Sequence, residues 1–263
     1  MLTFQALLDV ARLVGDVIEG VSTSGSTTTL VDTSLPSTTD NYYLGGTLFV
    51  RSGVPNVNTS RVITAHTNSS RTVSFGAAAA IVPAQAYTIC RLQYPRQALI
   101  TAVNQALVEI GAINKYVETV TTVTGQNEYS LPNGVANVLR VEIASNLAAP
   151  WGFIRNANWD EEDGKILFNT SKAPTTTGYK LRIHYYGTHA LVAADSDLIS
   201  DQIHPERLAW TAAYYAALNR TRQVGKDDPS LKDMMALFSG RITEMGMRFP
   251  IRLMARTGKG SGF

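Results

Sequence analysis

The chain has 263 residues, of which 44% are apolar; this is enough for one sizeable core or two modest ones and excludes an intrinsically disordered protein. Only 17% of the residues are charged, and the formal net charge of +2 lies well below the overall basicity of a nucleic-acid-binding domain. The single cysteine, Cys90, excludes an intrachain disulfide and a cysteine-rich zinc site, and it favours assembly in a reducing compartment.

The N-terminal residues predict a helix. Apolar residues recur at helical spacing from Phe4 to about Ile18, with Thr3 as the N-cap and Gly20 closing the helix. The segment lacks a basic stretch, and Asp9 interrupts its apolar residues, so we expect no signal peptide. No run is long enough to cross a bilayer, and we expect no membrane partner.

Residues 21–93 are predicted to form a β domain. After a stretch rich in Ser and Thr, short runs of β-branched and apolar residues are separated by turn residues, as in a small barrel or sandwich. The predicted strands lie at 46–51, 61–66, 71–75 and 86–90, and the middle two form a hairpin.

A second helix is predicted from Pro95 to about Ile113, with an apolar stripe along one side. The acidic residues Asp160 to Asp163 are expected at the tip of a hairpin, and clustered carboxylates on such a loop also suit a hard cation. The β-prone segments after this helix are 116–123, 129–131, 135–143, 151–159, 165–169 and 179–186.

The C-terminal part returns to helix. One helix is predicted at 205–223 and another at 229–248, the latter with Asp228 as its N-cap. Residues 249–263 include one proline and three glycines and lack a helical period, so they predict an extended arm.

Two segments carry an excess of positive charge. Residues 41–92 contain four basic residues and no acidic one, and the same is true of residues 245–263. Because these segments together carry +8 and the whole chain only +2, the rest of the chain carries −6. We therefore expect an acidic body with two basic appendages, which would be attracted to acidic clefts or to a polyanion. The basic residues are Arg51, Arg61, Arg71 and Arg91 in the first segment, and Arg248, Arg252, Arg256 and Lys259 in the second.

Large apolar residues alternate with the charges of the arm. Such an arm loses much conformational entropy unless a partner binds it, so we interpret it as a binding segment. Its expected contact residues are Arg248, Phe249, Ile251, Arg252, Leu253, Met254, Arg256, Lys259 and Phe263. For the arginines of the β domain, charges that keep exposed hairpins soluble are an equally good explanation.

No catalytic motif is present. The sequence has no H-E-x-x-H, no G-x-S-x-G, no G-x-x-x-x-G-K-[ST] and no G-x-G-x-x-G between a strand and a helix, and its four histidines are scattered. We predict a protein that is not an enzyme and that requires no cofactor or metal.

Two motifs carry a family resemblance. Residues 98–111 contain the pattern A-x-N-x-A-L-x-E-I-G, and residues 121–132 contain G-x-x-x-Y-x-L-P. This pairing of a helix with a strand resembles the head-to-tail adaptor (connector, or neck) proteins of tailed bacteriophages. Within the later predicted helices, residues 205–222 look like the second bundle helix of that family, and residues 229–247 look like the next. In outline the resemblance covers residues 1–19 and 94–250.

The resemblance, together with the predicted elements, implies an α+β fold: a helical bundle core with antiparallel β-hairpins, a small inserted β-barrel or β-sandwich domain and an extended C-terminal arm. The corresponding boundaries are 1–20 for the N-terminal helix of the bundle, 21–93 for the inserted β domain, 94–248 for the bundle with its hairpins and 249–263 for the arm.

In function, the resemblance implies a non-enzymatic virion structural protein assembled in the host cytoplasm. It forms a homo-oligomeric ring, usually a dodecamer, that joins the portal to the tail and lines the channel for DNA during genome ejection. An acidic body suits a wall past which DNA slides without sequence-specific binding. The family commonly docks a C-terminal segment between portal subunits, which assigns that role to the arm. The β insertion, with Arg51, Arg61, Arg71 and Arg91, is then expected to contact tail, stopper or nozzle proteins, capsid or neighbouring subunits.

Three alternatives stay open. A tail tube or nozzle ring subunit has the same properties at a different level of the virion. The Ser- and Thr-rich β domain also allows a receptor- or glycan-binding tail component, which is usually trimeric. An enzyme whose catalytic residues are dispersed along the chain is the third.

Overall fold

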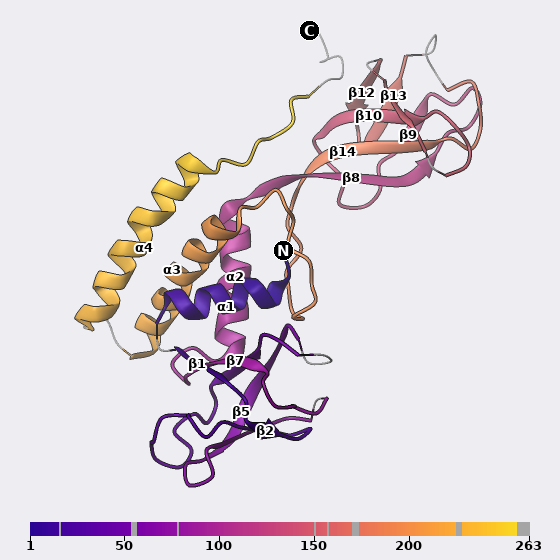
Figure 1. The fold of residues 1–263 in the computed structure, drawn as a ribbon. Coiled ribbons are helices and arrows are strands. Elements are labelled where there is room, and N and C mark those ends of the chain that lie inside the picture. The colour runs from indigo at the N-terminus through magenta and orange to yellow at the C-terminus, as the bar shows by residue number, and fades with distance from the viewer. Residues whose placement is uncertain are drawn as a thin grey trace. The chain divides into compact units, whose positions relative to one another are not determined.

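The α+β class is confirmed. A computed structural model describes residues 1–15, 17–53, 57–77, 79–149, 151–156, 158–169, 174–224 and 228–256. Over these ranges the chain has four helices and three antiparallel sheets (Figure 1). The helices are α1 (Thr3–Leu13), α2 (Arg96–Ile110), α3 (Pro205–Val224) and α4 (Pro229–Arg248).

The chain folds into two compact units, and each is built from two separate segments. The first unit comprises Met1–Ile110 and Ala190–Pro250, and the second comprises Gly111–His189 and Ile251–Phe263. All four helices belong to the first unit, whereas the second unit is made of strands and loops.

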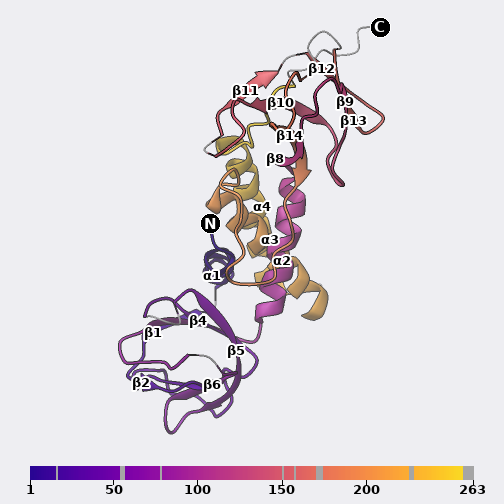
Figure 2. The ribbon, with the colours of Figure 1, turned by 90° about the vertical axis from the view of Figure 1, so that its right-hand side faces the viewer.

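In the first unit the helices pack around α3, which contacts α1, α2 and α4. Helix α1 runs across α2 and α3, as the two views in Figures 1 and 2 show. Small side chains on α3 allow its neighbours to approach closely, because five of its alanines are buried. These residues are Ala209, Ala212, Ala213, Ala216 and Ala217.

The N-terminal helix is shorter than predicted. It ends at Leu13, and Gly15 follows with a φ of 71°. Val17–Val21 forms strand β1 and pairs with β7 (Ala86–Cys90), so the expected extension to Ile18 was wrong. Thr3 is not a cap either: it is the first helical residue, and its hydroxyl donates to the carbonyl of Asp197 at 3.0 Å.

Helix α4 begins as predicted. The Asp228 carboxylate accepts hydrogen bonds from the backbone amides of Ser230 and Leu231, and Pro229 occupies the first turn. Helix α2, by contrast, ends three residues early at Ile110, where Gly111 takes a φ of 91° and Ile113 enters a strand.

Strand β5 joins two halves of one sheet in the β domain. Its first residues pair with β4, and its later residues pair with β6. Side chains of both halves share one core, in which Leu48 and Tyr87 from one half lie with Val73 and Phe75 from the other. Within the described residues the sheet is open, so a closed barrel is not formed. Its order is β1, β7, β4 (Thr47–Val50), β5 (Thr59–Thr67), β6 (Thr72–Phe75), β3 (Thr29–Val31) and β2 (Ser24–Gly25).

The second unit contains two sheets that share a core. The larger has the order β11 (Phe153–Asn156), β10 (Val138–Ala144), β14 (Lys180–Thr188) and β8 (Ala112–Thr121). The smaller has the order β12 (Trp159–Glu162), β13 (Lys165–Phe168) and β9 (Glu128–Ser130). Trp159 and Phe168 from the smaller sheet lie in one cluster with Val141 and Ile183 from the larger.

The hairpin around the acidic residues differs from the prediction. Asp160, Glu161 and Glu162 lie within β12, and only Asp163 and Gly164 form the turn. The segment 151–159 is also divided, because β11 pairs with β10 while β12 pairs with β13.

A buried hydrogen bond in the β domain provides a test of this core. The Tyr87 hydroxyl donates to the Asp32 carboxylate at 2.6 Å, and both residues are buried. Strand β1 passes so close that a Cβ at Gly20 would lie 2.5 Å from this hydroxyl. Burial alone would raise the pKa of Asp32, but hydrogen bonds from Ser34 and Tyr87 outweigh burial and lower the pKa.

We predict that Tyr87→Phe lowers the free energy of unfolding by about 1.5–3 kcal/mol at pH 7, because it removes a hydrogen bond to a charged acceptor. The wild-type contribution is present above the unfolded pKa of about 3.9 and is lost as the pH falls through the lower folded pKa. The deficit of the variant should therefore shrink below about pH 4 in urea titrations. The exposed Tyr116→Phe is the control, and a deficit independent of pH would contradict the prediction.

Candidate functional site

The predicted arm is anchored where it leaves α4. The Phe249 ring stacks on the His204 ring, with centroids 3.5 Å apart and planes 3° apart. Arg207 donates to the carbonyl of Phe249 at 3.2 Å, and the Arg248 guanidinium lies 5.2 Å from the Phe249 ring centroid. Phe249 is therefore held by contacts within the first unit, whereas the arm from Ile251 onward belongs to the second unit.

The next residues of the arm lie on the second unit. The side-chain amide of Asn114 donates to the carbonyl of Arg252 at 2.9 Å and accepts from the amide of Met254 at 3.0 Å. The Tyr186 hydroxyl donates to the carbonyl of Met254 at 2.6 Å. Asn114 and Tyr186 are register partners on β8 and β14, so the two contacts come from one place on the sheet.

Arg256 makes the last contact of the described arm. Its guanidinium lies 3.1 Å from the Asp160 carboxylate and 5.6 Å from the centroid of the Trp159 ring. The side chains of Arg252 and Leu253 remain exposed. Ile251 is half-buried, and Lys259 and Phe263 lie outside the described residues.

The four arginines of the β domain have separate partners. Arg51 lies 3.5 Å from Glu19 and donates to the carbonyl of Tyr87, and Arg61 donates to the carbonyl of Ser60. Arg71 donates to the carbonyl of Leu35, and Arg91 donates to the Tyr42 hydroxyl. Each arginine thus contacts different residues, and the contacts of the described residues do not gather the four side chains into one binding site.

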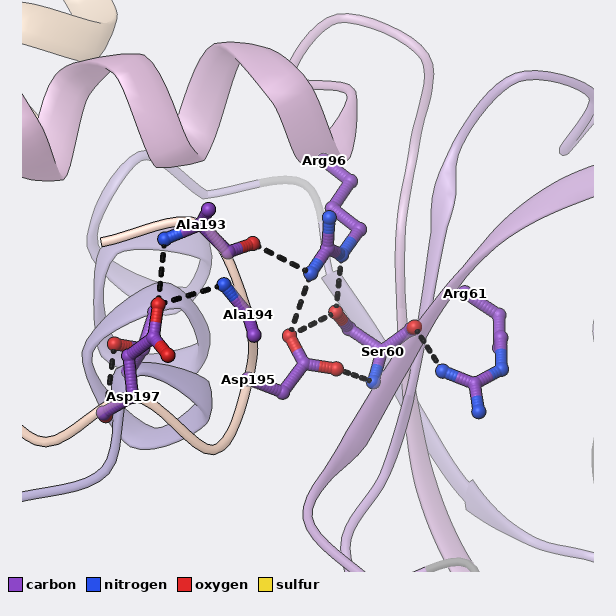
Figure 3. Close-up of polar contacts among 8 residues, drawn as sticks. Ser60, Arg61, Arg96, Ala193, Ala194, Asp195 and Asp197 are labelled. Atoms are coloured by element: carbon purple, nitrogen blue, oxygen red, sulfur yellow. Dashed lines mark hydrogen bonds and ion pairs between the residues drawn. The ribbon is translucent and has the colours of Figure 1, made fainter. Parts of the chain in front are cut away.

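A polar cluster that the sequence analysis missed fastens the β domain to the helices (Figure 3). The Asp195 carboxylate accepts from the amide of Ser60 at 2.6 Å, from the Ser60 hydroxyl at 2.7 Å and from Arg96 at 3.0 Å. Arg96 also donates to the Ser60 hydroxyl at 2.7 Å. Strand β5, the start of α2 and the loop before α3 thus meet at one carboxylate.

The composition of this cluster indicates a structural role and not a catalytic one. Ser60 is only 2% exposed, and its described partners are a carboxylate and a guanidinium, with no histidine to act as a base. Asp197 orders the same loop, because its carboxylate accepts hydrogen bonds from the amides of Ala193 and Ala194 at 2.8 and 2.9 Å. The same bonds lower the pKa of its carboxyl.

The larger sheet of the second unit has a charged face. The Glu142 carboxylate lies 3.1 Å from the Arg140 guanidinium and 3.1 Å from the His184 ring nitrogen, and Arg182 lies 2.6 Å from Glu118. Lys180, Arg182 and His184 share this face, because successive side chains of a strand point to opposite sides and Leu181 and Ile183 enter the core. Most of these charges are compensated within the sheet.

No metal site is formed by the parts of the chain that the structure describes, in which no group of three or more His, Cys, Asp or Glu side chains is suitably placed. In the acidic run, Asp160 binds Arg256, and Glu161 accepts from the amide of Val138. None of the described helices is long and apolar enough to cross a membrane.

Comparison with known proteins identifies the family of this chain. A sequence model described as SU10 adaptor protein matches residues 76–258. Because the match spans well over half of the chain, the protein belongs to the SU10 adaptor protein family, and it is a phage virion adaptor protein. The predicted resemblance is thereby confirmed.

The match includes β7, α2, α3, α4, both sheets of the second unit and the described part of the arm. It begins after β6, so the resemblance of residues 1–19 stays a prediction. A search of curated proteins finds no match. Among solved structures, a co-crystal structure of the regulatory domain of Toxoplasma gondii PKA with cAMP is similar at 8% identity and a TM-score of 0.18, covering 68% of this chain and 88% of that one. A TM-score this low supports no argument.

We predict that Asp195→Ala lowers the free energy of unfolding of the first unit by about 2–4 kcal/mol, because it removes the carboxylate that accepts from the Ser60 amide, the Ser60 hydroxyl and Arg96. Urea titration followed by hydrogen exchange in β5 and α2 measures the loss and its location. Asp201→Ala, an exposed position in the same loop, is the control and should change stability by less than about 0.5 kcal/mol. An equal effect of the two substitutions would contradict the role of Asp195.

Proposed function

We propose that this phage virion adaptor protein forms a closed ring, a dodecamer, at the junction of head and tail, where it joins the portal to the tail. The observation that carries the proposal is the family match over residues 76–258, which extends from the helices into the arm. A heterologous ring requires two different faces on each subunit. The chain offers one unit that combines the four helices with the β domain and a second unit made of strands, and each unit has buried core residues of its own.

We propose further that the ring lines the channel through which DNA leaves during genome ejection. The chain outside its two basic segments carries −6, and an acidic wall does not retain a phosphate backbone. The protein then acts by position and charge, with no catalytic step.

The arm is proposed as the portal-docking segment. The exposed side chains of Arg252 and Leu253 present one cation and one large apolar group on a backbone that is already extended. Arg248 and Phe249 serve chiefly to fix the origin of the arm, because they contact each other and His204. The β domain, residues 21–93, is proposed as the contact surface toward tail proteins or neighbouring subunits.

We predict that removing residues 251–263 abolishes capture by the portal of the same phage and leaves the fold intact. Deletion from residue 251 is preferable to deletion from Phe249, because it preserves the contacts of Phe249 with His204 and Arg207. A pull-down with mass photometry of the complex measures capture and copy number.

Binding of about one full-length copy per portal subunit supports the adaptor ring. Undiminished capture of the truncated protein would remove the arm from the mechanism. Failure of both proteins to bind would favour a tail tube or nozzle position, and a native trimer would favour a receptor-binding component.

We predict that Arg252→Glu weakens portal binding roughly tenfold at low salt, with a smaller effect at high salt, because an exposed charge is screened. Among the arm arginines in the described residues, Arg252 is the most suitable for charge reversal. Its side chain is exposed, whereas Arg248 contacts Phe249 and Arg256 contacts Asp160. Arg222→Glu, at an exposed position in the last turn of α3, is the matched control. An unchanged affinity for Arg252→Glu would assign docking to the apolar side chains.

A further inference from the structure

The second unit holds a binding site for an extended peptide. Asn114 uses both ends of its side-chain amide, donating to the carbonyl of residue 252 and accepting from the amide of residue 254. These are the backbone groups that a neighbouring β-strand would engage, so the side chain substitutes for a strand partner. Tyr186 satisfies the carbonyl of Met254 from the adjacent strand.

The site also has a position for a guanidinium. Two residues after the backbone contacts, Arg256 is held by the Asp160 carboxylate and lies near the Trp159 ring. Its side chain is 45% exposed and that of Asp160 is 33% exposed, so this pair adds less than the backbone hydrogen bonds. The site therefore fits an extended segment with an arginine at its end, and residues 252–256 of this chain occupy it.

We propose that this site retains the arm in the free subunit and that docking to a partner displaces it. The displacement rests on the proposed function, whereas the retention does not. Four hydrogen bonds hold residues 252, 254 and 256 of the arm. A partner that binds these residues must therefore compete with Asn114, Tyr186 and Asp160. The exposed side chains of Arg252 and Leu253 remain available for a first contact.

Trypsin measures the retention directly on the full chain without any partner. It cleaves after Arg252, at the peptide bond whose carbonyl accepts from Asn114. When opening is fast, the cleavage rate follows the population of the released arm. Tyr186→Phe should raise that rate roughly three- to tenfold, and Asn114→Ala, which removes two hydrogen bonds, should raise it more.

Asp160→Asn should have the smallest effect of the three, because its ion pair is half-exposed. Tyr185→Phe is the matched control, since it removes a hydroxyl from the adjacent residue of β14, on the side of Leu181 and Ile183. Far-UV circular dichroism confirms that each variant is folded, and Tyr186→Phe keeps its aromatic ring.

Equal cleavage rates after Arg252 in wild type, Tyr186→Phe and Asn114→Ala would overturn the retention. Protection of the wild type that disappears on dilution would also overturn it, because the occupant would then be the arm of a second copy. Protection independent of concentration supports it.

Displacement is measured separately, by the rate at which the portal captures each variant. Release of the arm in Tyr186→Phe should speed capture by the same three- to tenfold factor. Faster cleavage without faster capture would overturn displacement and leave retention standing. Absence of capture for every variant would reject the proposed function, while the trypsin result still decides retention.

Discussion

The loop at residues 190–199 is the constraint on which the first unit depends. It accepts backbone hydrogen bonds from Thr3 and Phe4 and pairs with Met1 through Ile199, so it fixes the start of α1. Through Asp195 the same loop binds the start of β5 and the first residue of α2. The Asp195 side chain is only 11% exposed, and a carboxylate that has lost most of its water depends on its protein donors. The helices and the β domain therefore hold their arrangement through contacts between segments that are far apart in sequence.

The elements of this fold were predictable where the local pattern was sufficient. The apolar stripe and caps identified α2, α3 and α4, and short β-branched runs identified most strands. The errors occurred where a distant partner decides the structure. Ile18 continues the helical period of α1 but pairs with Ile89, and Ile113 continues that of α2 but pairs with Gly187. A window of sequence does not contain those partners, and at both places a glycine with positive φ ends the helix.

The same limit explains which parts of the site were missed. Composition predicts that the arm is a binding segment, because charges and large apolar groups alternate there without a period, and that role stays a prediction. Its intramolecular partners are not predictable in this way: Asn114 and Arg252 are separated by 138 residues, and the motif around Asn114 is an ordinary strand. Asp195 lies in a loop of alanine, serine and aspartate, whose composition indicates a turn and gives no sign of a buried joint. For the β-domain arginines, separate in-chain partners agree with the solubility explanation as well as with a contact surface.

The boundary of the family match has a physical consequence for the β domain. The match begins at residue 76 and so includes β7, yet β7 pairs with β1 on one side and β4 on the other. Tyr87, Ile89 and Cys90 of β7 are fully buried, and burial raises the pKa of the Cys90 thiol to about 12. Without residues 17–50 this strand would expose both its edges and its apolar side chains. Deleting the β domain would therefore disrupt the part of the chain that matches the family model. The last strand of the domain leads directly into α2, whose first residue, Arg96, donates to Asp195.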